Sequence, residues 1–292
     1  MTAPVGTPAR SAQLLRKYGI AARKSLGQNF LIDGNILRIV ADAAELGPED
    51  GVLEIGPGLG ALTERLAERA GRVVAVEIDR RLLPVLEEAL APYPNVEIVH
   101  GDVLKLDLRA LIRERFAGAR RVAVAANLPY YITTPILMKL LEERLPLSVI
   151  VVMVQREVAD RLKAAPGGKD YGSLSVAAQY FTEPEWIAAV PRTVFLPPPN
   201  VESAVLRLRV RGRPAVETSD EPLFFEIVRA AFAQRRKTLL NNLQRLPAAQ
   251  PLGKDGVRRW IEAAGVSPDR RGETLTLPEF AALADALAAR RR

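Results

Sequence analysis

Short apolar runs alternate with amphipathic stretches over residues 51–210. The runs typical of strands are Val52–Ile55, Arg72–Ile78, Val96–His100, Arg121–Ala126, Val149–Val154, Trp186–Val190 and Ala204–Val210. Several are apolar almost throughout, as strands are when both faces of a parallel sheet are covered. Helical periodicity appears between them, in Leu62–Ala70, Arg80–Leu90, Pro135–Glu143 and Glu157–Ala164. This alternation predicts a doubly wound α/β domain.

After residue 211 the pattern changes to helices alone. The helical stretches are Glu221–Gln234, Thr238–Leu246, Gly256–Ala264 and Pro278–Arg290. A chain of 292 residues is about 1.5 to 2 times the length of a typical domain, so a second domain is expected. We therefore predict a basic arm over residues 1–32, an α/β domain over 33–211 and a small all-helical domain over 212–292.

Composition excludes several classes of protein and of chemistry. Hydrophobic residues make up 48% of the chain and charged residues 26%, which is ordinary globular usage and argues against a disordered or fibrous chain. There is no Cys and only one His, His100, so disulfides, thiolate nucleophiles and Cys- or His-based metal sites are excluded. The longest apolar stretch, Leu145–Val154, is too short to span a bilayer, and no signal-peptide core is present. We expect a cytoplasmic protein without a bound metal.

Positive charge is concentrated at the two ends of the chain. The formal net charge is +7, yet no carboxylate precedes Asp33, and residues 211–292 carry 15 Lys and Arg against 10 Asp and Glu. The segment between these flanks is slightly acidic. Such an asymmetry suits a catalytic body flanked by surfaces that attract nucleic acid, although solvated charged faces would give the same pattern.

A glycine-rich turn and two carboxylates follow the first three predicted strands. The first strand runs into Glu54–Ala61, in which Gly56, Gly58 and Gly60 allow the backbone to approach a ligand closely. Glu77 ends the second strand, where a carboxylate accepts hydrogen bonds from the ribose of nucleoside cofactors. Asp102 follows the third strand and would lie beside the same cleft. The turn also matches the looser dinucleotide pattern, so a nicotinamide-dependent oxidoreductase stays open at this point.

The four residues after the fourth predicted strand narrow the class of enzyme. Asn127, Leu128, Pro129 and Tyr130 present a side-chain amide oxygen, a backbone carbonyl and an aromatic face in one short turn. The amine of a nucleobase is a poor nucleophile, because its lone pair is delocalised into the ring. Two acceptors that hold its hydrogens would aim the lone pair while the ring of Tyr130 stacks on the base. A hydride-transfer enzyme has no use for such a turn.

Six motifs in order make the chain resemble the ribosomal RNA adenine N6,N6-dimethyltransferase family, and within it the KsgA-type enzymes of the small ribosomal subunit. The motifs are QNFL at 28–31, EIGPGLGALT at 54–63, Glu77, Gly101-Asp102, NLPY at 127–130 and FLPPPNVES at 195–203. The stretches FAQRRKTLLNNL at 232–243 and SPDRRGETLTLPEF at 267–280 extend the similarity to the helical domain. The resemblance implies a Rossmann-like class I methyltransferase sheet that binds S-adenosylmethionine. It also implies two adjacent N6,N6-dimethyladenosines in a hairpin loop near the 3′ end of 16S rRNA, made during small-subunit biogenesis.

The resemblance also assigns roles to individual residues. Asn29 and Leu31 match an arm that closes over the cofactor; Gly56, Gly58 and Gly60 match the glycine turn. Glu77 matches the ribose ligand, Asp102 the acid beside the adenine of the cofactor, and Asn127 the residue shared by cofactor and target base. Tyr130 and Phe195 match the aromatic pair around the target adenine. Tyr131 departs from the small or polar residue expected after NLPY, and Asn200 and Glu202 are milder departures.

Basic residues outside the cleft are the candidate RNA contacts. Arg235, Arg236 and Lys237 lie together in the helical domain, and Arg23 and Lys24 lie in the arm. Their positions predict binding that weakens with salt, whereas intradomain ion pairs would explain them equally well. We expect a monomer.

Three other functions stay open. A large-subunit rRNA methyltransferase has the same active-site pattern, although FAQRRKTL and SPDRRGETL favour the small-subunit branch. An RNA-binding assembly factor with a vestigial cofactor pocket would not need Asn127, Tyr130 and Glu77 intact. The nicotinamide-dependent oxidoreductase depends on the glycine pattern alone.

Overall fold

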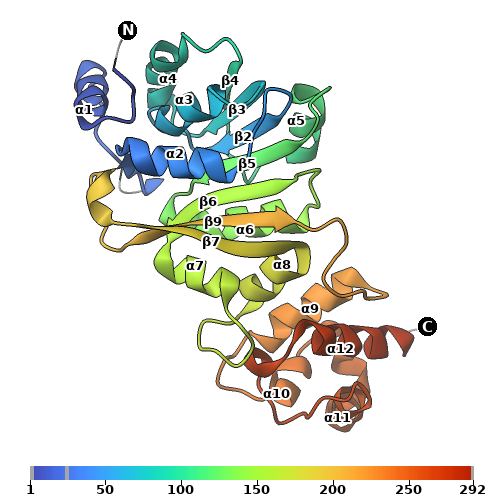
Figure 1. The fold of residues 1–292 in the computed structure, drawn as a ribbon. Coiled ribbons are helices and arrows are strands. Elements are labelled where there is room, and N and C mark those ends of the chain that lie inside the picture. Colours follow the sequence, from blue (N-terminus) through green and yellow to red (C-terminus); the bar gives the residue numbers. More distant parts are fainter. Residues whose placement is uncertain (1–2, 24–25, 291–292) are drawn as a thin grey trace. The chain divides into compact units, whose positions relative to one another are not determined.

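The computed structural model describes residues 3–23 and 26–290 (Figure 1). The chain divides into two compact units, residues 1–159 with 183–210, and residues 160–182 with 211–292. The second unit thus includes residues 160–182, which the sequence analysis placed in the α/β domain.

A seven-stranded sheet forms the centre of the first unit. Its strands are β2 (Gly51–Ile55), β3 (Arg72–Glu77), β4 (Val96–His100), β5 (Val122–Asn127), β6 (Val149–Gln155), β7 (Thr182–Val190) and β9 (Ser203–Val210). They lie in the order β4-β3-β2-β5-β6-β9-β7. The ladders from β4 to β6 are parallel, and β9 pairs antiparallel to β6. The predicted doubly wound α/β fold is confirmed.

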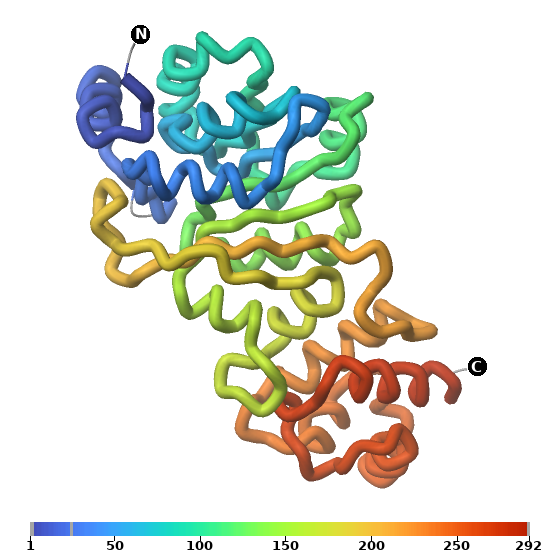
Figure 2. Tube along the Cα trace, viewed as in Figure 1, coloured from blue at the N-terminus to red at the C-terminus, as the bar shows by residue number. Residues whose placement is uncertain are grey.

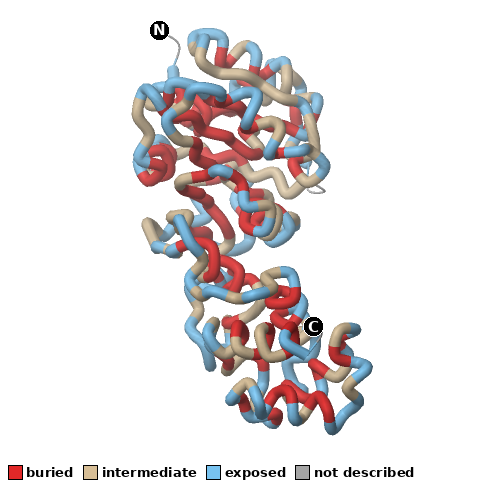
Figure 3. The backbone as a smooth tube through the Cα atoms, turned by 90° about the vertical axis from the view of Figure 1, so that its right-hand side faces the viewer, coloured by how far each residue is buried: buried red, intermediate tan, exposed pale blue. Residues whose placement is uncertain are grey.

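Helices surround this sheet, and Arg10 and Lys17 of the first helix bond Glu88 of the fourth. They are α1 (Pro8–Lys17), α2 (Gly34–Ala43), α3 (Ala61–Ala67), α4 (Leu83–Leu90), α5 (Leu108–Arg115) and α6 (Thr133–Glu142), and α7 (Arg156–Lys163) begins directly after β6. Elements of this unit are joined by 3-10 turns at Arg80–Leu82 (η2), Tyr130–Ile132 (η3) and Arg192–Val194 (η4). Strands β2, β5 and β6 are buried along nearly their whole length, and Figure 3 shows buried backbone (red) in the interior of the first unit. Burial on both faces explains why these strands are continuous apolar runs.

A second, two-stranded sheet joins segments far apart in the sequence. Strand β1 (Phe30–Leu31) pairs antiparallel with β8 (Phe195–Leu196), with Phe30 opposite Leu196 and Leu31 opposite Phe195. The Ile32 amide continues the ladder by donating to the Val194 carbonyl at 2.9 Å. Figure 2 shows the two segments side by side (blue and yellow). The ladder brings together the QNFL and FLPPP motifs.

The second unit is helical. Its elements are α8 (Ser173–Phe181), α9 (Glu221–Ala231), α10 (Leu239–Leu243), η5 (Pro247–Leu252), α11 (Gly253–Ala263), η6 (Gly272–Thr274) and α12 (Leu277–Ala289). Helix α12 begins with a capping box, in which Thr276 and Glu279 bond each other's backbone amides. The buried Trp260 donates its indole N–H to the Leu283 carbonyl at 2.9 Å and ties α11 to α12. No helix in the described ranges is long and apolar enough to cross a membrane.

Candidate active site

A cavity opens at the carboxyl ends of β2, β3, β4 and β5. It holds about 1070 Å³ of free space, counting the part open to solvent. Parallel α/β sheets bind their ligands at this edge. The sequence-predicted residues that line it are Asn29, Leu31, Gly56, Gly58, Glu77, Asp102, Asn127, Leu128, Pro129 and Tyr130. Segments spread over a hundred residues therefore meet in one place.

The glycine turn follows β2 and needs left-handed backbone. Gly56 and Gly58 have φ of 70° and 60°, a conformation that side-chain-bearing residues rarely adopt. A Cβ on Gly58 would lie 3.2 Å from the Phe30 ring. Gly60 does not line the cavity; it begins α3 with φ of 89°, and a Cβ there would meet Leu86 and Leu90 at 3.3 Å. Gly60 therefore lets Leu86 and Leu90 pack closely against the start of α3, whereas Gly56 and Gly58 line the cavity.

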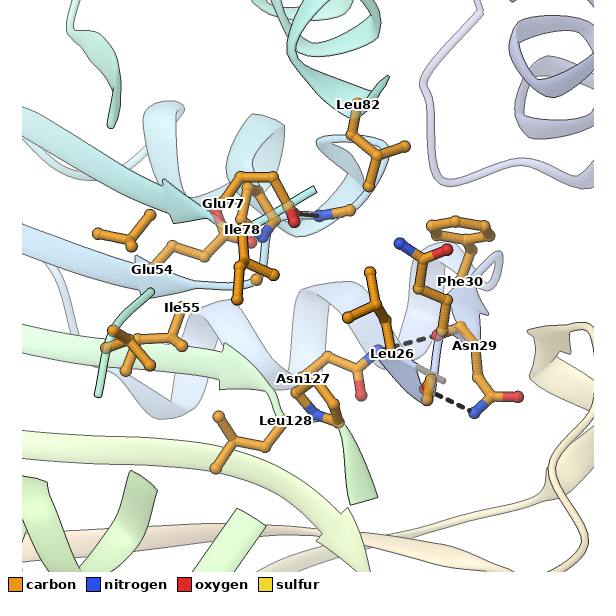
Figure 4. A pocket seen from close by; sticks show the side chains of 18 of the residues that line it. Leu26, Asn29, Phe30, Glu54, Ile55, Glu77, Ile78, Leu82, Asn127 and Leu128 are labelled. Atoms are coloured by element: carbon orange, nitrogen blue, oxygen red, sulfur yellow. Dashed lines mark hydrogen bonds between the residues drawn. The ribbon is translucent and has the colours of Figure 1, made fainter. Parts of the chain in front are cut away.

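Glu77 is held at the cavity wall by backbone amides. Its side chain is 4% exposed (Figure 4). Its Oε1 accepts from the Asp79 amide at 2.8 Å and its Oε2 from the Gly58 amide at 3.2 Å. Burial raises the pKa of this carboxyl above its usual range, and the two amides oppose that shift by stabilising the charged form. Each oxygen keeps a lone pair for a further donor. The geometry fits a ligand that offers two neighbouring hydroxyls.

Asp102 also lines the cavity, at the end of β4. Its Oδ1 accepts from the Leu104 amide at 3.0 Å, and Lys105 lies 3.9 Å from Oδ2. The first bond fixes the carboxylate in the turn, and the second oxygen is free of backbone bonds within the described residues. Asp102 is thus a fixed acceptor on the same rim as Glu77.

Glu54 is a site residue that the sequence analysis quoted but did not assign. It is the penultimate residue of β2, is fully buried and lines the cavity (Figure 4). Neither Glu54 Oε2 nor the nearby Thr63 hydroxyl completes a hydrogen bond within the described residues. Burial raises the pKa of Glu54 to about 8, and the neighbouring charge of Glu77 adds to the rise. An acid inside an otherwise apolar strand was the available signal.

Asn127 ends β5 with its amide orientation fixed. Its Nδ2 donates to the Asn29 carbonyl at 3.2 Å, and the Asn29 side chain in turn donates to the Gly27 carbonyl at 3.1 Å (Figure 4). Because the nitrogen of the Asn127 amide is engaged by the arm, the Oδ1 atom is presented as an acceptor. The QNFL arm therefore contacts the NLPY turn directly.

The backbone of the NLPY turn leaves one carbonyl available. The Pro129 carbonyl already accepts from the Ile132 amide at 3.2 Å and the Thr133 hydroxyl at 2.9 Å. The Leu128 amide donates to Met153 at 3.1 Å, and within the described residues no donor reaches the Leu128 carbonyl. The two acceptors at the turn are therefore Asn127 Oδ1 and the Leu128 carbonyl.

The two aromatic residues expected around a target base lie in different surroundings. Tyr130 lines the cavity, and its hydroxyl shares a 2.6 Å hydrogen bond with Ser203 at the start of β9. Phe195 is 1% exposed, belongs to the hydrophobic core and does not line the cavity. Side chains alternate along β8, and Phe195 is the inward one opposite Leu31. The expectation that Phe195 faces the base is not met by this arrangement.

The arm is attached to the β3 edge of the site through Asp79. Gln28 donates from Nε2 to Asp79 at 2.9 Å, and Arg81 donates to both oxygens of the same carboxylate. These contacts, with Arg81 the largest, lower the pKa of Asp79 to about 2. The exposed Arg23 guanidinium lies 3.9 Å from Asp79, and Lys24 falls outside the described residues. Asp79 therefore stays charged and anchors the arm.

The basic cluster of the second unit lies in the loop between α9 and α10. Arg235 donates to the Lys169 carbonyl and lies 3.7 Å from Glu273, so it is partly engaged within its own unit. Arg236 and Lys237 are exposed, and within the described residues neither has an ion-pair partner. Two of the three predicted cations are therefore available to an anionic ligand.

The fold is that of a class I methyltransferase, a Rossmann-like sheet that carries a glycine turn, the buried acid Glu77 and an Asn-Leu-Pro-Tyr turn at one edge. The ribosomal RNA adenine dimethylase family model matches residues 19–282. The chain belongs to that family.

Known relatives are similar to this chain over most of its length. A ribosomal RNA small subunit methyltransferase A from Geobacillus sp. (strain WCH70) is 58% identical over 288 residues, which are 98% of this chain and 99% of the relative. The crystal structure of a dimethyladenosine transferase from Plasmodium falciparum is 25% identical with a TM-score of 0.69, covering 87% of this chain and 95% of the other. That of the 23S rRNA methyltransferase ErmE is 30% identical with a TM-score of 0.63, covering 89% and 100%.

Proposed function

We propose that the protein transfers methyl groups from S-adenosylmethionine to N6 of two adjacent adenosines in a hairpin loop near the 3′ end of 16S rRNA. The products are two N6,N6-dimethyladenosines, made during assembly of the small subunit. The observation that carries this proposal is the paired acceptor at the NLPY turn, Asn127 Oδ1 with the Leu128 carbonyl, beside the cavity. Family membership supplies the substrate class.

The residues at the cavity wall fit S-adenosylmethionine. Gly56 and Gly58 leave room for close approach of the ligand to the backbone, and Glu77 offers the two lone pairs that ribose hydroxyls require. Asp102 is placed to accept from the amine of the cofactor's adenine, and Asn29 and Leu31 cover the site from the arm. The cofactor supplies an electrophilic methyl group on a positively charged sulfur. The carboxylate of Glu77, whose charged form is stabilised by two backbone amides, complements that charge.

The chain's own contribution to the reaction is alignment of the amine. Before the first transfer Asn127 Oδ1 and the Leu128 carbonyl accept the two N6 hydrogens, and before the second transfer one of them accepts the hydrogen that remains, so that the nitrogen lone pair faces the methyl group each time. Tyr130 stacks on the base, with its ring fixed by the bond to Ser203. No residue in the cavity is required as a strong base, because the amine loses its proton after the bond to carbon has formed.

The small-subunit substrate is favoured over the large-subunit one. The chain is 58% identical to a small subunit methyltransferase A and 30% identical to ErmE, a 23S rRNA methyltransferase. The exposed Arg236 and Lys237 of the second unit and Arg23 of the arm are the proposed RNA contacts. We propose that the protein works as a cytoplasmic monomer.

The test uses isotopically labelled S-adenosylmethionine and small subunits from cells that lack this modification. After digestion to nucleosides, mass spectrometry should find labelled N6,N6-dimethyladenosine. The control is Asn127→Ala, which removes one acceptor of the amine and no phosphate contact, so it should abolish transfer and still bind subunits. Better labelling of protein-free large-subunit RNA would assign the protein to the other ribosomal subunit.

An assembly factor with an inactive cofactor pocket is the alternative that this experiment also addresses. Binding of the subunit without any labelled product would establish it. The intact Glu77 and Asn127 geometry favours turnover, because a vestigial pocket has no need to hold both side chains in fixed orientations.

A further inference from the structure

Exposed large hydrophobic side chains are rare on the described residues and gather near the cavity. Three are exposed, namely Ile78 at 46%, Tyr131 at 56% and Val201 at 43%, and the first two line the cavity. Apolar groups gathered at a cavity mouth mark a binding surface. Ile78 follows the ribose acid Glu77, so it belongs to the cofactor half of the cavity. Tyr131 follows Tyr130 and belongs to the half that receives the target base.

The two adjacent tyrosines of η3 occupy different environments. In a 3-10 turn successive side chains diverge by about 120°, so neighbours cannot share one direction. Tyr130 is tied to Ser203 through its hydroxyl, whereas the Tyr131 hydroxyl has no hydrogen bond within the described residues. A Cβ on Gly27 would lie 3.1 Å from Tyr131 Cδ1, so the arm supports the ring from one side. The rest of the Tyr131 ring is open to solvent.

We propose that Tyr131 is a stacking platform for the nucleobase next to the target adenosine. The proposal rests on the proposed function, because it requires a single-stranded RNA loop at the cavity. A base that enters the cavity leaves its stack and exposes a face of its neighbour. The open ring of Tyr131 at the mouth of the cavity replaces that lost contact, and aromatic stacking of this kind tolerates any base. Because the targets are adjacent, the stacked neighbour is the other adenosine of the pair.

The position of Phe195 strengthens this assignment. The loop after β8 brings no aromatic face to the cavity, since Phe195 is buried in the core. Tyr130 and Tyr131 are therefore the aromatic residues that line the cavity apart from Phe30, whose ring lies against Gly58 on the cofactor side. In this proposal Tyr130 stacks on the target base inside the cavity, and Tyr131 stacks on the neighbouring base at its mouth.

A purely structural role for Tyr131 would be support of the arm at Gly27. Two substitutions separate the roles. Tyr131→Leu keeps an apolar side chain against Gly27 and removes the aromatic face, whereas Tyr131→Phe keeps the face and removes only the hydroxyl. If the ring only supported the arm, its loss would lower the affinity for the cofactor. The reason is that the arm also carries Asn29, whose carbonyl orients Asn127.

The experiment combines a binding signal with a transfer assay. An RNA hairpin carries two adjacent loop purines, one adenosine and one 2-aminopurine, whose fluorescence is quenched by stacking. We expect quenching with the wild type and with Tyr131→Phe, and a brighter complex with Tyr131→Leu. On undermodified small subunits, Tyr131→Leu should raise the KM for the subunit about tenfold, whereas Tyr131→Phe should have the KM of the wild type. Calorimetry should find the wild-type affinity for S-adenosylmethionine in both variants.

The outcomes distinguish this inference from the proposed function. If the wild type labels both adenosines and Tyr131→Leu matches it in KM and fluorescence, the platform is wrong and the proposed function stands. A parallel loss of cofactor affinity in Tyr131→Leu would assign the ring to the arm instead. If the wild type labels no subunits, the proposed function fails. In that case, quenching by the wild type that is lost in Tyr131→Leu would still support a base platform at Tyr131. Equal quenching by the wild type and Tyr131→Leu would overturn it.

Discussion

Replacing Glu54 by Gln should remove a pH-dependent loss of stability from the first unit. Glu54 is fully buried at the end of β2, and its Oε2 atom has no hydrogen-bond partner within the described residues. Burial, with a further contribution from Glu77, raises the pKa of Glu54 to about 8 from an ordinary value of 4.5. The folded protein therefore favours the neutral acid, and an amide is the neutral group of closest shape.

The sign and size of the effect follow from proton linkage. Below pH 4.5 Glu54 is protonated in both the folded and the unfolded chain, so its favourable contribution is complete. Above that pH the unfolded chain releases the proton and the folded chain keeps it, and the free energy of unfolding falls by about 1.4 kcal/mol per pH unit. The fall ends near pH 8, after a total on the order of 5 kcal/mol. Gln is uncharged throughout and has no such slope.

The assay uses the tryptophans, of which each unit carries one. Trp186 lies in β7 of the first unit and Trp260 in α11 of the second. In a Trp260→Phe background, urea unfolding followed by fluorescence reports on the first unit alone. We expect the stability gap between chains with and without Glu54→Gln to widen by about 1.4 kcal/mol per pH unit between about pH 5 and about pH 8. The exposed Glu114→Gln is the control and should leave the slope unchanged. Parallel pH profiles for the chains with and without Glu54→Gln would refute the reasoning.

Three further predictions test other parts of the site. Glu77→Ala should weaken S-adenosylmethionine binding at least tenfold in calorimetric titration, because two hydrogen bonds to a charged acceptor are lost; unchanged affinity would exclude the ribose role. Gly58→Ala forces a side chain into φ of 60° against Phe30, so it should cost about 1–2 kcal/mol in thermal unfolding and also weaken cofactor binding; an unaltered melting temperature would contradict the strain. Combined Arg236→Ala and Lys237→Ala should reduce the slope of log affinity for small subunits against log salt by about 1.5; an identical slope would show that neither cation contacts phosphate.

Local patterns predicted the sheet and several residues that line the cavity. Buried parallel strands appear as apolar runs, and residues at their carboxyl ends are brought to one edge whatever the rest of the chain does. Glu77 and Asn127 were predicted on that basis together with the family resemblance, and both line the cavity. The prediction that Glu77 and Asn127 lie at one edge did not depend on the lengths of the helices between the strands.

Other features depend on contacts that local patterns do not encode. The burial of Phe195 follows from its register opposite Leu31, a pairing between segments more than 160 residues apart. Gly60 looks like its neighbours in the turn, yet its position under Leu86 and Leu90 is set by the packing of α4 on α3. The division of residues 160–182 from the first unit likewise reflects tertiary contacts rather than composition.

The short β1–β8 ladder explains how the two halves of the cavity are coordinated. On its β1 side the arm supplies the Asn29 carbonyl that orients the Asn127 amide at 3.2 Å. On its β8 side the chain continues to Ser203, which holds the Tyr130 hydroxyl at 2.6 Å. Asn127, the proposed amine acceptor, and Tyr130, the proposed stacking ring, are thus both held by segments that flank one two-stranded sheet. Because the Asn29 carbonyl holds the Asn127 amide, the proposed function implies that displacement of the arm would disturb the amine acceptor together with the cofactor site.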